Sequence, residues 1–255
     1  MPSPSAGPAP SGQHPTARVS VPPTGTDRPS APRDTLAASA WFLYAAAVLV
    51  HVLALAVDNA TLAGPTKLTL MPLLAVAAWL GVRHRLGGPG RVTFALLLAA
   101  VALSWLGDGA ATFTPFLPTL PAMLGFFGLA HVAYIVVFWR RLAVRPLGWA
   151  VAWLPVWWIG MVLTVAPHAG GLAVAVAAYG IVLACTCAAS WRGPFPAWWG
   201  GIAFLVSDSI LAFRLFLPDM PHWTSPAVML TYGVGQGLLV WAACRGLSSP
   251  GRGGE

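Results

Sequence analysis

Residues 200–216 read GGIAFLVSDSILAFRLF, an almost wholly apolar stretch that carries Asp208 in its middle and Arg214 near its end. A helix of about 20 apolar residues is what a bilayer core of roughly 30 Å requires. A carboxylate inside such a helix is costly, and intramembrane charges usually serve a function. This stretch therefore predicts a membrane span that contributes to a functional site.

The rest of the chain repeats this apolar character. Of 255 residues, 57% are hydrophobic and 8% are charged, whereas an ordinary soluble domain has roughly 25% charged residues. The sequence predicts an all-α fold, a polytopic membrane bundle of eight transmembrane helices. The predicted spans are 36–57, 66–82, 92–113, 120–139, 147–166, 170–190, 197–217 and 224–244.

The basic residues predict how the bundle is oriented. All of the 14 Lys and Arg residues except Lys67 and Arg214 fall in the two tails or in the loops after the second, fourth and sixth spans. The opposite loops have none, so the positive-inside rule predicts that both termini are cytoplasmic. Because topology accounts for the net charge of +7, no nucleic-acid partner is expected.

The two ends of the chain differ in composition from the spans. Residues 1–35 are rich in Pro, Ser, Thr, Gly and Ala, which predicts a disordered cytoplasmic tail. This tail lacks the features of a cleaved secretory signal, so the first span is expected to remain in the mature protein. A single membrane domain is predicted over 36–244, followed by a short cytoplasmic tail over 245–255. No internal repeat is evident, and the three cysteines are expected to be packing residues.

Polar side chains on six of the predicted spans fall at similar depths, in the outer half or the middle of the membrane. Each would be costly alone in hydrocarbon, so we expect them to meet around a common cavity. His131 shares a helix face with Tyr134, three residues on. Ser207 has no histidine at a matching spacing, which favours a hydroxyl bonded to a neighbouring helix. The polar residues at these depths are Lys67, Asp108, His131, Tyr179, Asp208, Tyr232 and Gln236.

Several of these residues also have purely structural interpretations. Lys67 and Arg214 lie near helix ends, where long side chains can reach the headgroup layer. His51, on the first span, has no comparable polar neighbour and is expected to be structural.

Taken in order, the motifs of these spans resemble the lysoplasmalogenase family, also called YhhN-like, of eight-span membrane proteins. The resemblance covers about residues 40–244. It departs at the second span, where the family pattern has Lys-Pro, whereas here Lys67 is followed by Leu68 and the proline comes at Pro72. The motifs are TKLTLMPLL with Lys67, LSWLGDGAATF with Asp108, GFFGLAHVAYIVVF with His131 and Tyr134, Tyr179, GGIAFLVSDSILAFRLF with Ser207 and Asp208, and TYGVGQGLL with Tyr232 and Gln236.

The resemblance implies hydrolysis of the vinyl ether bond of lysoplasmalogens with ethanolamine or choline head groups, releasing a fatty aldehyde. Protonation of a vinyl ether gives an oxocarbenium ion that water captures, so the reaction needs a general acid, a stabilising carboxylate and a positioned water. Asp108 and Asp208 are predicted to divide the first two roles in either order, with His131 as the third catalytic residue. The predicted substrate-binding residues are Lys67 at the phosphate, Tyr134, Tyr179, Ser207, Tyr232 and Gln236.

No cofactor and no metal are predicted. The expected partners are a lysophospholipid and the lipid bilayer of the cell membrane, and the oligomeric state is left open.

Two other functions remain open from the sequence. Buried Asp and Lys residues could couple ions or protons in a transporter. Asp108, Asp208 and His131 could instead hold the metal of a metal-dependent lipid hydrolase. A retinal-type receptor fits less well, because the intramembrane lysine lies in an early span.

Overall fold

The computed structural model describes residues 31–248, and within this range every regular element is a helix. Eight spans are long and apolar enough to cross a membrane, which confirms the predicted bundle. Three of them join an α-helix to short 3-10 or π-helical turns. The helices are α1 (Ala31–Ala56), α2 (Ala60–Val82), α3 (Gly88–Asp108), α4 (Ala110–Phe113), α5 (Thr119–Val136), α6 (Leu154–Val165), α7 (Ala173–Arg192), α8 (Ala197–Phe216) and α9 (Thr224–Ser248), with the short turns η1 (Val137–Arg141), η2 (Trp149–Val151), η3 (Ala166–His168) and η4 (Gly170–Leu172).

The first and last helices extend beyond the predicted membrane domain. α1 begins at Ala31 and α9 ends at Ser248, so residues 31–35 and 245–248, predicted as parts of the tails, are helical. Hydropathy marks where a helix leaves the hydrocarbon and not where its backbone hydrogen bonds end. The remainder of the two predicted tails, 1–30 and 249–255, lies outside the described residues.

The third span stops at its aspartate because a glycine follows. The Gly109 N–H donates to the Trp105 carbonyl at 3.0 Å, after which the separate turn α4 begins. A Cβ at position 109 would collide with the ring of Phe113. Asp108 therefore lies at the C-terminal end of α3, whereas the predicted span continued to residue 113.

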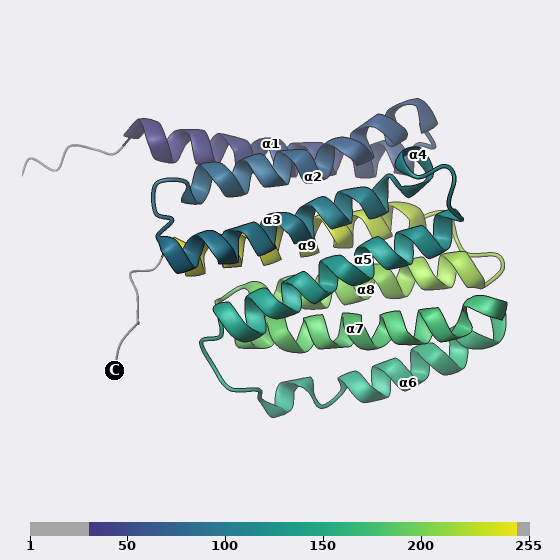
Figure 1. Cartoon of the computed structure of the whole chain (residues 1–255). Coiled ribbons are helices and arrows are strands. Elements are labelled where there is room, and N and C mark those ends of the chain that lie inside the picture. The colour runs from purple at the N-terminus through teal and green to yellow at the C-terminus, as the bar shows by residue number, and fades with distance from the viewer. Residues whose placement is uncertain (1–30, 249–255) are drawn as a thin grey trace, which may run out of the picture. The chain divides into compact units, whose positions relative to one another are not determined.

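The eight spans divide into two groups of four, the first made of α1, α2, α3 and α5 and the second of α6, α7, α8 and α9, and three helices of each group pack in the same way. From one side of the bundle to the other, the order runs from α1 and α2 through α3, α9, α5 and α8 to α7 and α6 (Figure 1). α2 packs on α3 and α9, as α7 packs on α8 and α5, and α3 packs on α5 as α8 packs on α9. Exchanging α2, α3 and α5 with α7, α8 and α9 therefore reproduces these contacts, whereas α6 packs more extensively on α7 and α8 than α1 packs on α2 and α3. This is a structural repeat, although no repeat was evident in the sequence.

α8 and α9 pack backbone to backbone through two glycines. A Cβ on Gly200 would lie 2.8 Å from the Leu239 nitrogen, and one on Gly235 would lie 2.8 Å from the Phe204 nitrogen. Small residues let membrane helices approach closely, which matters because lipid competes equally well for ordinary apolar contacts. The close approach fixes the polar face of α9 relative to α8.

Arginines of the loops gather at one end of the bundle, the end where α2 finishes and α3 begins (Figure 1). Several stack on tryptophan rings there, with guanidinium-to-ring distances of 4.6 to 5.1 Å. Trp and Arg are typical of membrane interfaces. This is the end predicted to be cytoplasmic, and that orientation stays a prediction. The stacked pairs are Arg145 with Trp191, Arg192 with Trp139 and Arg245 with Trp241.

Candidate functional site

Asp108 is held at the end of α3 by a cation and a phenol. Lys67 Nζ, on α2, lies 3.4 Å from its Oδ1, and the Tyr232 OH, on α9, donates to its Oδ2 at 2.7 Å. The side chain of Asp108 is 3% exposed and that of Lys67 is 34% exposed. A carboxylate buried without a partner costs several kcal/mol. Lys67 therefore compensates the charge of Asp108, and its side chain is partly exposed at the surface of the bundle.

A chain of hydrogen bonds runs behind Tyr232 through the core. Gln236 Nε2 donates to Ser104 Oγ at 2.9 Å and to the Tyr232 OH at 3.4 Å, while its Oε1 accepts from the Tyr134 OH at 2.5 Å. All four side chains are buried. Tyr134 bonds to Gln236, and Gln236 bonds to Tyr232. This geometry suits a role in holding the Tyr232 phenol in place better than the substrate contact predicted for Tyr134 and Gln236.

Asp208, on α8, has a different set of partners. Its Oδ2 accepts a hydrogen bond from the Tyr179 OH on α7, and His131 Nε2 on α5 lies 3.9 Å from the same oxygen. Within residues 31–248, Oδ1 has no partner, and no Lys or Arg nitrogen lies within 4.0 Å of the carboxylate. Asp208 thus lacks the cation that Asp108 has.

His131 is fully buried, yet neither ring nitrogen has a hydrogen-bond partner in the described part of the chain. Its ring packs edge-on against Phe204 and Tyr179, at centroid distances of 4.5 and 5.7 Å. Buried polar atoms are normally satisfied, by ordered water where protein groups are lacking. His131 therefore offers two free hydrogen-bonding positions beside Asp208.

The two aspartates have corresponding partners in the two groups of spans. Each lies on the third span of its own group, next to one polar residue from the second span of that group and another from the fourth span of the other group. Neither set of contacts is complete without both groups. Asp108 and Asp208 occupy the two third spans, Lys67 and Tyr179 come from the two second spans, and Tyr232 and His131 come from the two fourth spans, at different turns of their helices.

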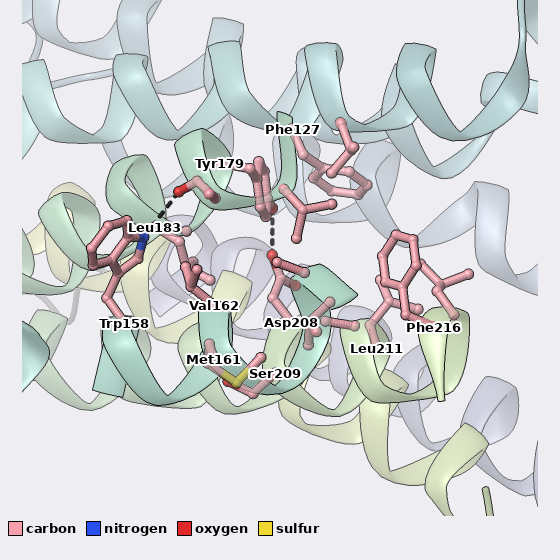
Figure 2. A pocket seen from close by; sticks show the side chains of 18 of the residues that line it. Phe127, Trp158, Met161, Val162, Tyr179, Leu183, Asp208, Ser209, Leu211 and Phe216 are labelled. Carbon is pink, nitrogen blue, oxygen red and sulfur yellow. Dashed lines mark hydrogen bonds between the residues drawn. The ribbon is translucent and has the colours of Figure 1, made fainter. Parts of the chain in front are cut away.

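An apolar cavity between α5, α6, α7 and α8 leads to Asp208. Figure 2 shows Tyr179 reaching the Asp208 carboxylate, with Trp158 at one end of the cavity and Phe216 at the other. Its volume of about 70 Å³ has room for several waters, since one water needs about 10–15 Å³. Asp108 and Lys67 are not among its lining residues. The cavity is therefore lined by Asp208, the aspartate that has no Lys or Arg partner, and its apolar side chains surround that carboxylate.

Three polar residues considered from the sequence make their contacts elsewhere. Ser207 Oγ donates to a backbone carbonyl of α9 at 3.0 Å, which suits the helix-bonding role, and the substrate contact predicted for it stays a prediction. Arg214 Nη1 donates to Thr224 Oγ1 at 2.5 Å and pairs with neither intramembrane aspartate. His51 Nδ1 lies 2.9 Å from Thr66 Oγ1, which suits the structural role expected of it.

Other residues of the site were not indicated by spacing. Ser209 lines the cavity and accepts a hydrogen bond from Trp157 Nε1 at 3.1 Å. The ring of Phe204 lies between His131 and Tyr232, whose ring centroid is 5.4 Å away. Phe127 lines the cavity and contacts Tyr232 edge-on at 6.0 Å. These aromatic rings separate the surroundings of the two carboxylates.

A signal for this arrangement does exist in the sequence. Aliphatic–small–Asp–small occurs as LGDG at 106–109 and as VSDS at 206–209. Aromatic–Gly–aliphatic–small–polar occurs as FGLAH at 127–131 and as YGVGQ at 232–236. The two members of each pair lie on corresponding spans. Once the spans are matched, the repeat indicates Phe127 as the counterpart of Tyr232.

The three predicted metal ligands do not form a set. Across residues 31–248, no group of three or more His, Cys, Asp or Glu side chains is placed to hold a metal ion. Asp108 is bound by Lys67 and Tyr232, whereas His131 lies beside Asp208. This arrangement does not favour the metal-dependent alternative.

Known proteins match the part of the chain that contains the site. The YhhN family profile matches residues 62–243, from α2 into α9. The human protein lysoplasmalogenase TMEM86B is 30% identical over 180 residues, which cover 69% of this chain and 73% of that relative. No solved structure matches the chain significantly. All the residues of the polar layer fall within the matched range, whereas α1 precedes it.

Proposed function

We propose, because this chain belongs to the YhhN family, that it is an integral membrane hydrolase that cleaves the vinyl ether bond of lysoplasmalogens. The products are a fatty aldehyde and a glycerophospho head group. The name of the human relative supports the substrate class. The observation that carries the proposal is the Asp208 carboxylate on an apolar cavity, with a second, cation-paired carboxylate in the same polar layer.

The chemistry starts with proton transfer from a carboxylic acid to the vinyl ether carbon that is not bonded to oxygen. This leaves an oxocarbenium ion at the other carbon. Water adds there and returns a proton to the carboxylate, which restores the acid. The resulting hemiacetal collapses, its hydroxyl proton ends on the glycerol oxygen, and the aldehyde is released. General acid–base catalysis of this kind typically contributes about 10²–10⁴-fold.

Asp208 is the proposed acid. It reaches the cavity in which an alkenyl chain would lie, and no Lys or Arg in residues 31–248 is within ion-pair distance to stabilise its charged form. The Tyr179 OH donates to Oδ2, which leaves Oδ1 to carry the proton toward the substrate.

Asp108 is the proposed ionised carboxylate. The ammonium group of Lys67 at 3.4 Å favours its charged form, and the resulting negative charge would stabilise the oxocarbenium ion. The exposed side of Lys67 is the proposed contact for the phosphate, and His131, with both nitrogens free, would orient the attacking water.

The decisive experiment is an aldehyde-release assay on the purified protein in nanodiscs. An alkenyl lysolipid and its matched acyl lysolipid are supplied side by side. We expect aldehyde from the alkenyl lipid and no fatty acid from the acyl lipid. Equal turnover of both would indicate a general lysophospholipase, and no turnover of the alkenyl lipid would refute the proposal.

Transport is a second candidate, because one observation favours it. Two like-oriented groups of four spans around a polar layer are an arrangement that many transporters share. Flux of a lysolipid or a proton across proteoliposomes, without chemical change of the lipid, would establish this function in place of hydrolysis.

A further inference from the structure

The two carboxylates of the proposed site are reached from different sides. Asp208 opens on the apolar cavity, whereas Asp108 lies behind the partly exposed Lys67 and does not line that cavity. If the alkenyl chain occupies the cavity and the phosphate lies at Lys67, the glycerol must pass between these two regions.

The ring of Phe127 stands in that passage. It lines the cavity on one side and, on the other, contacts edge-on the ring of Tyr232, whose OH binds Asp108. It also covers Gly107, the residue before Asp108, so closely that a Cβ there would lie 2.7 Å from its Cδ2 and Cε2 atoms. The residue beside the ionised carboxylate is thus shielded from the cavity by this one ring.

Phe127 and Tyr232 differ in how firmly they are held. They are corresponding residues of the repeated FGLAH and YGVGQ motifs, and they meet where the two groups of spans join. Tyr232 is fixed by hydrogen bonds to Asp108 and Gln236. Phe127 has no polar anchor and is held by ring packing alone, against Tyr232 and Gly107. The Phe127 ring is therefore the partner that can move.

We infer that Phe127 is a specificity-determining residue whose ring must leave Gly107 before a glycerophosphate can extend from the cavity to Lys67. This inference rests on the proposed function. The ring sets how well an alkenyl lipid with a phosphate head group is used relative to one without it, because the larger polar group needs the wider opening.

The test compares two substrates with the same alkenyl chain, a lysoplasmalogen and 1-O-alk-1′-enylglycerol, which lacks the phosphate. The measured quantity is kcat/KM for the lysoplasmalogen divided by kcat/KM for 1-O-alk-1′-enylglycerol. Phe127→Leu should raise this ratio at least about fivefold. The control, Leu120→Ala, removes another cavity-lining side chain of α5 and should leave the ratio within about twofold, because the chain is common to both lipids.

A second variant probes the same contact from the other side. Gly107→Ala places a methyl group where the ring lies, so it should raise the ratio in the same direction, with no further increase when combined with Phe127→Leu. Phe127→Met replaces Phe127→Leu if the latter does not give a monodisperse protein.

Outcomes separate this inference from the function it rests on. Failure of the wild-type protein to cleave either lipid would refute the proposed function. Cleavage of both, with an unchanged or lower ratio in the Phe127 variant, would overturn the specificity role alone.

Discussion

The two intramembrane aspartates differ in their immediate surroundings, so substitution should affect them differently. Asn at position 208 keeps an oxygen for the Tyr179 OH but removes the proton donor. We expect Asp208→Asn to lower aldehyde release by about 10²–10⁴-fold with little change in melting temperature. Asp219→Asn, at an exposed loop aspartate, is the control and should retain normal activity. Activity of Asp208→Asn above about a tenth of wild type would argue against the acid role.

The ion pair at Asp108 makes a prediction about stability. Lys67→Met leaves a carboxylate that is 3% exposed without its cation, so the melting temperature should fall. Loss of one partner of a fully buried pair costs about 3–5 kcal/mol, and the partial exposure of Lys67 should reduce this cost.

Adding Asp108→Asn to Lys67→Met should restore most of the lost stability, because the uncompensated charge is then gone. Thermal unfolding of the single and double variants in one detergent measures this coupling. Equal melting temperatures for the two variants would show that the Asp108 carboxylate does not destabilise the fold when its cation is removed.

Residue types and helical periodicity predicted which polar side chains share a layer, but not how they pair. Asp108 and Asp208 have different partners, and Ser207 faces α9, not the cavity. Rotation of one helix about its axis decides such contacts. An all-round apolar sequence does not specify that rotation, since no polar face marks the side that points to lipid.

At the level of helices, the α8–α9 contact should depend on glycine. Gly235→Ala would place a Cβ 2.8 Å from the Phe204 nitrogen, a backbone atom that cannot rotate away. We expect a loss of about 1–3 kcal/mol, the usual cost of overpacking, seen as a lower melting temperature.

The matched control is Gly125→Ala on α5, where a Cβ would meet no atom within 4 Å. It should be neutral or stabilising by about 0.4–1 kcal/mol, because alanine reduces the freedom of the unfolded chain. Similar effects of the two substitutions would contradict a close-packed contact between α8 and α9.

Apolar segments of about 20 residues predicted all eight spans, since the bilayer thickness sets this length. Helix ends were less predictable. The stop at Gly109 depends on the ring of Phe113 packing against a residue without a Cβ, and this contact exists only after the chain folds back into α4.

For the molecule as a whole, the basic loops predict an orientation that labelling can test. In a variant with Cys185, Cys187 and Cys244 replaced by alanine, single cysteines are introduced as Asp219→Cys or Arg85→Cys. A membrane-impermeant maleimide should label the first in intact cells and the second only after permeabilisation. The reverse pattern would place the arginine-rich end outside.

Fold class and span number could be predicted from composition. The repeated packing of the two groups of spans could not, because apolar segments resemble one another whatever their order. The paired LGDG and VSDS motifs are informative only once spans are compared group by group. The cavity could not be predicted, since it depends on the fit of side chains from four helices.

Each aspartate contacts a residue from the other group of spans, and this has a consequence for biosynthesis. Spans leave the ribosome in order, so Asp108 and Lys67 can enter the bilayer together as an ion pair, and Tyr179 can accompany Asp208. Tyr232 arrives on the last helix to be made. The polar layer therefore closes only when translation is nearly complete, and a truncated or incompletely inserted chain would carry the charges of the site without the contact from Tyr232.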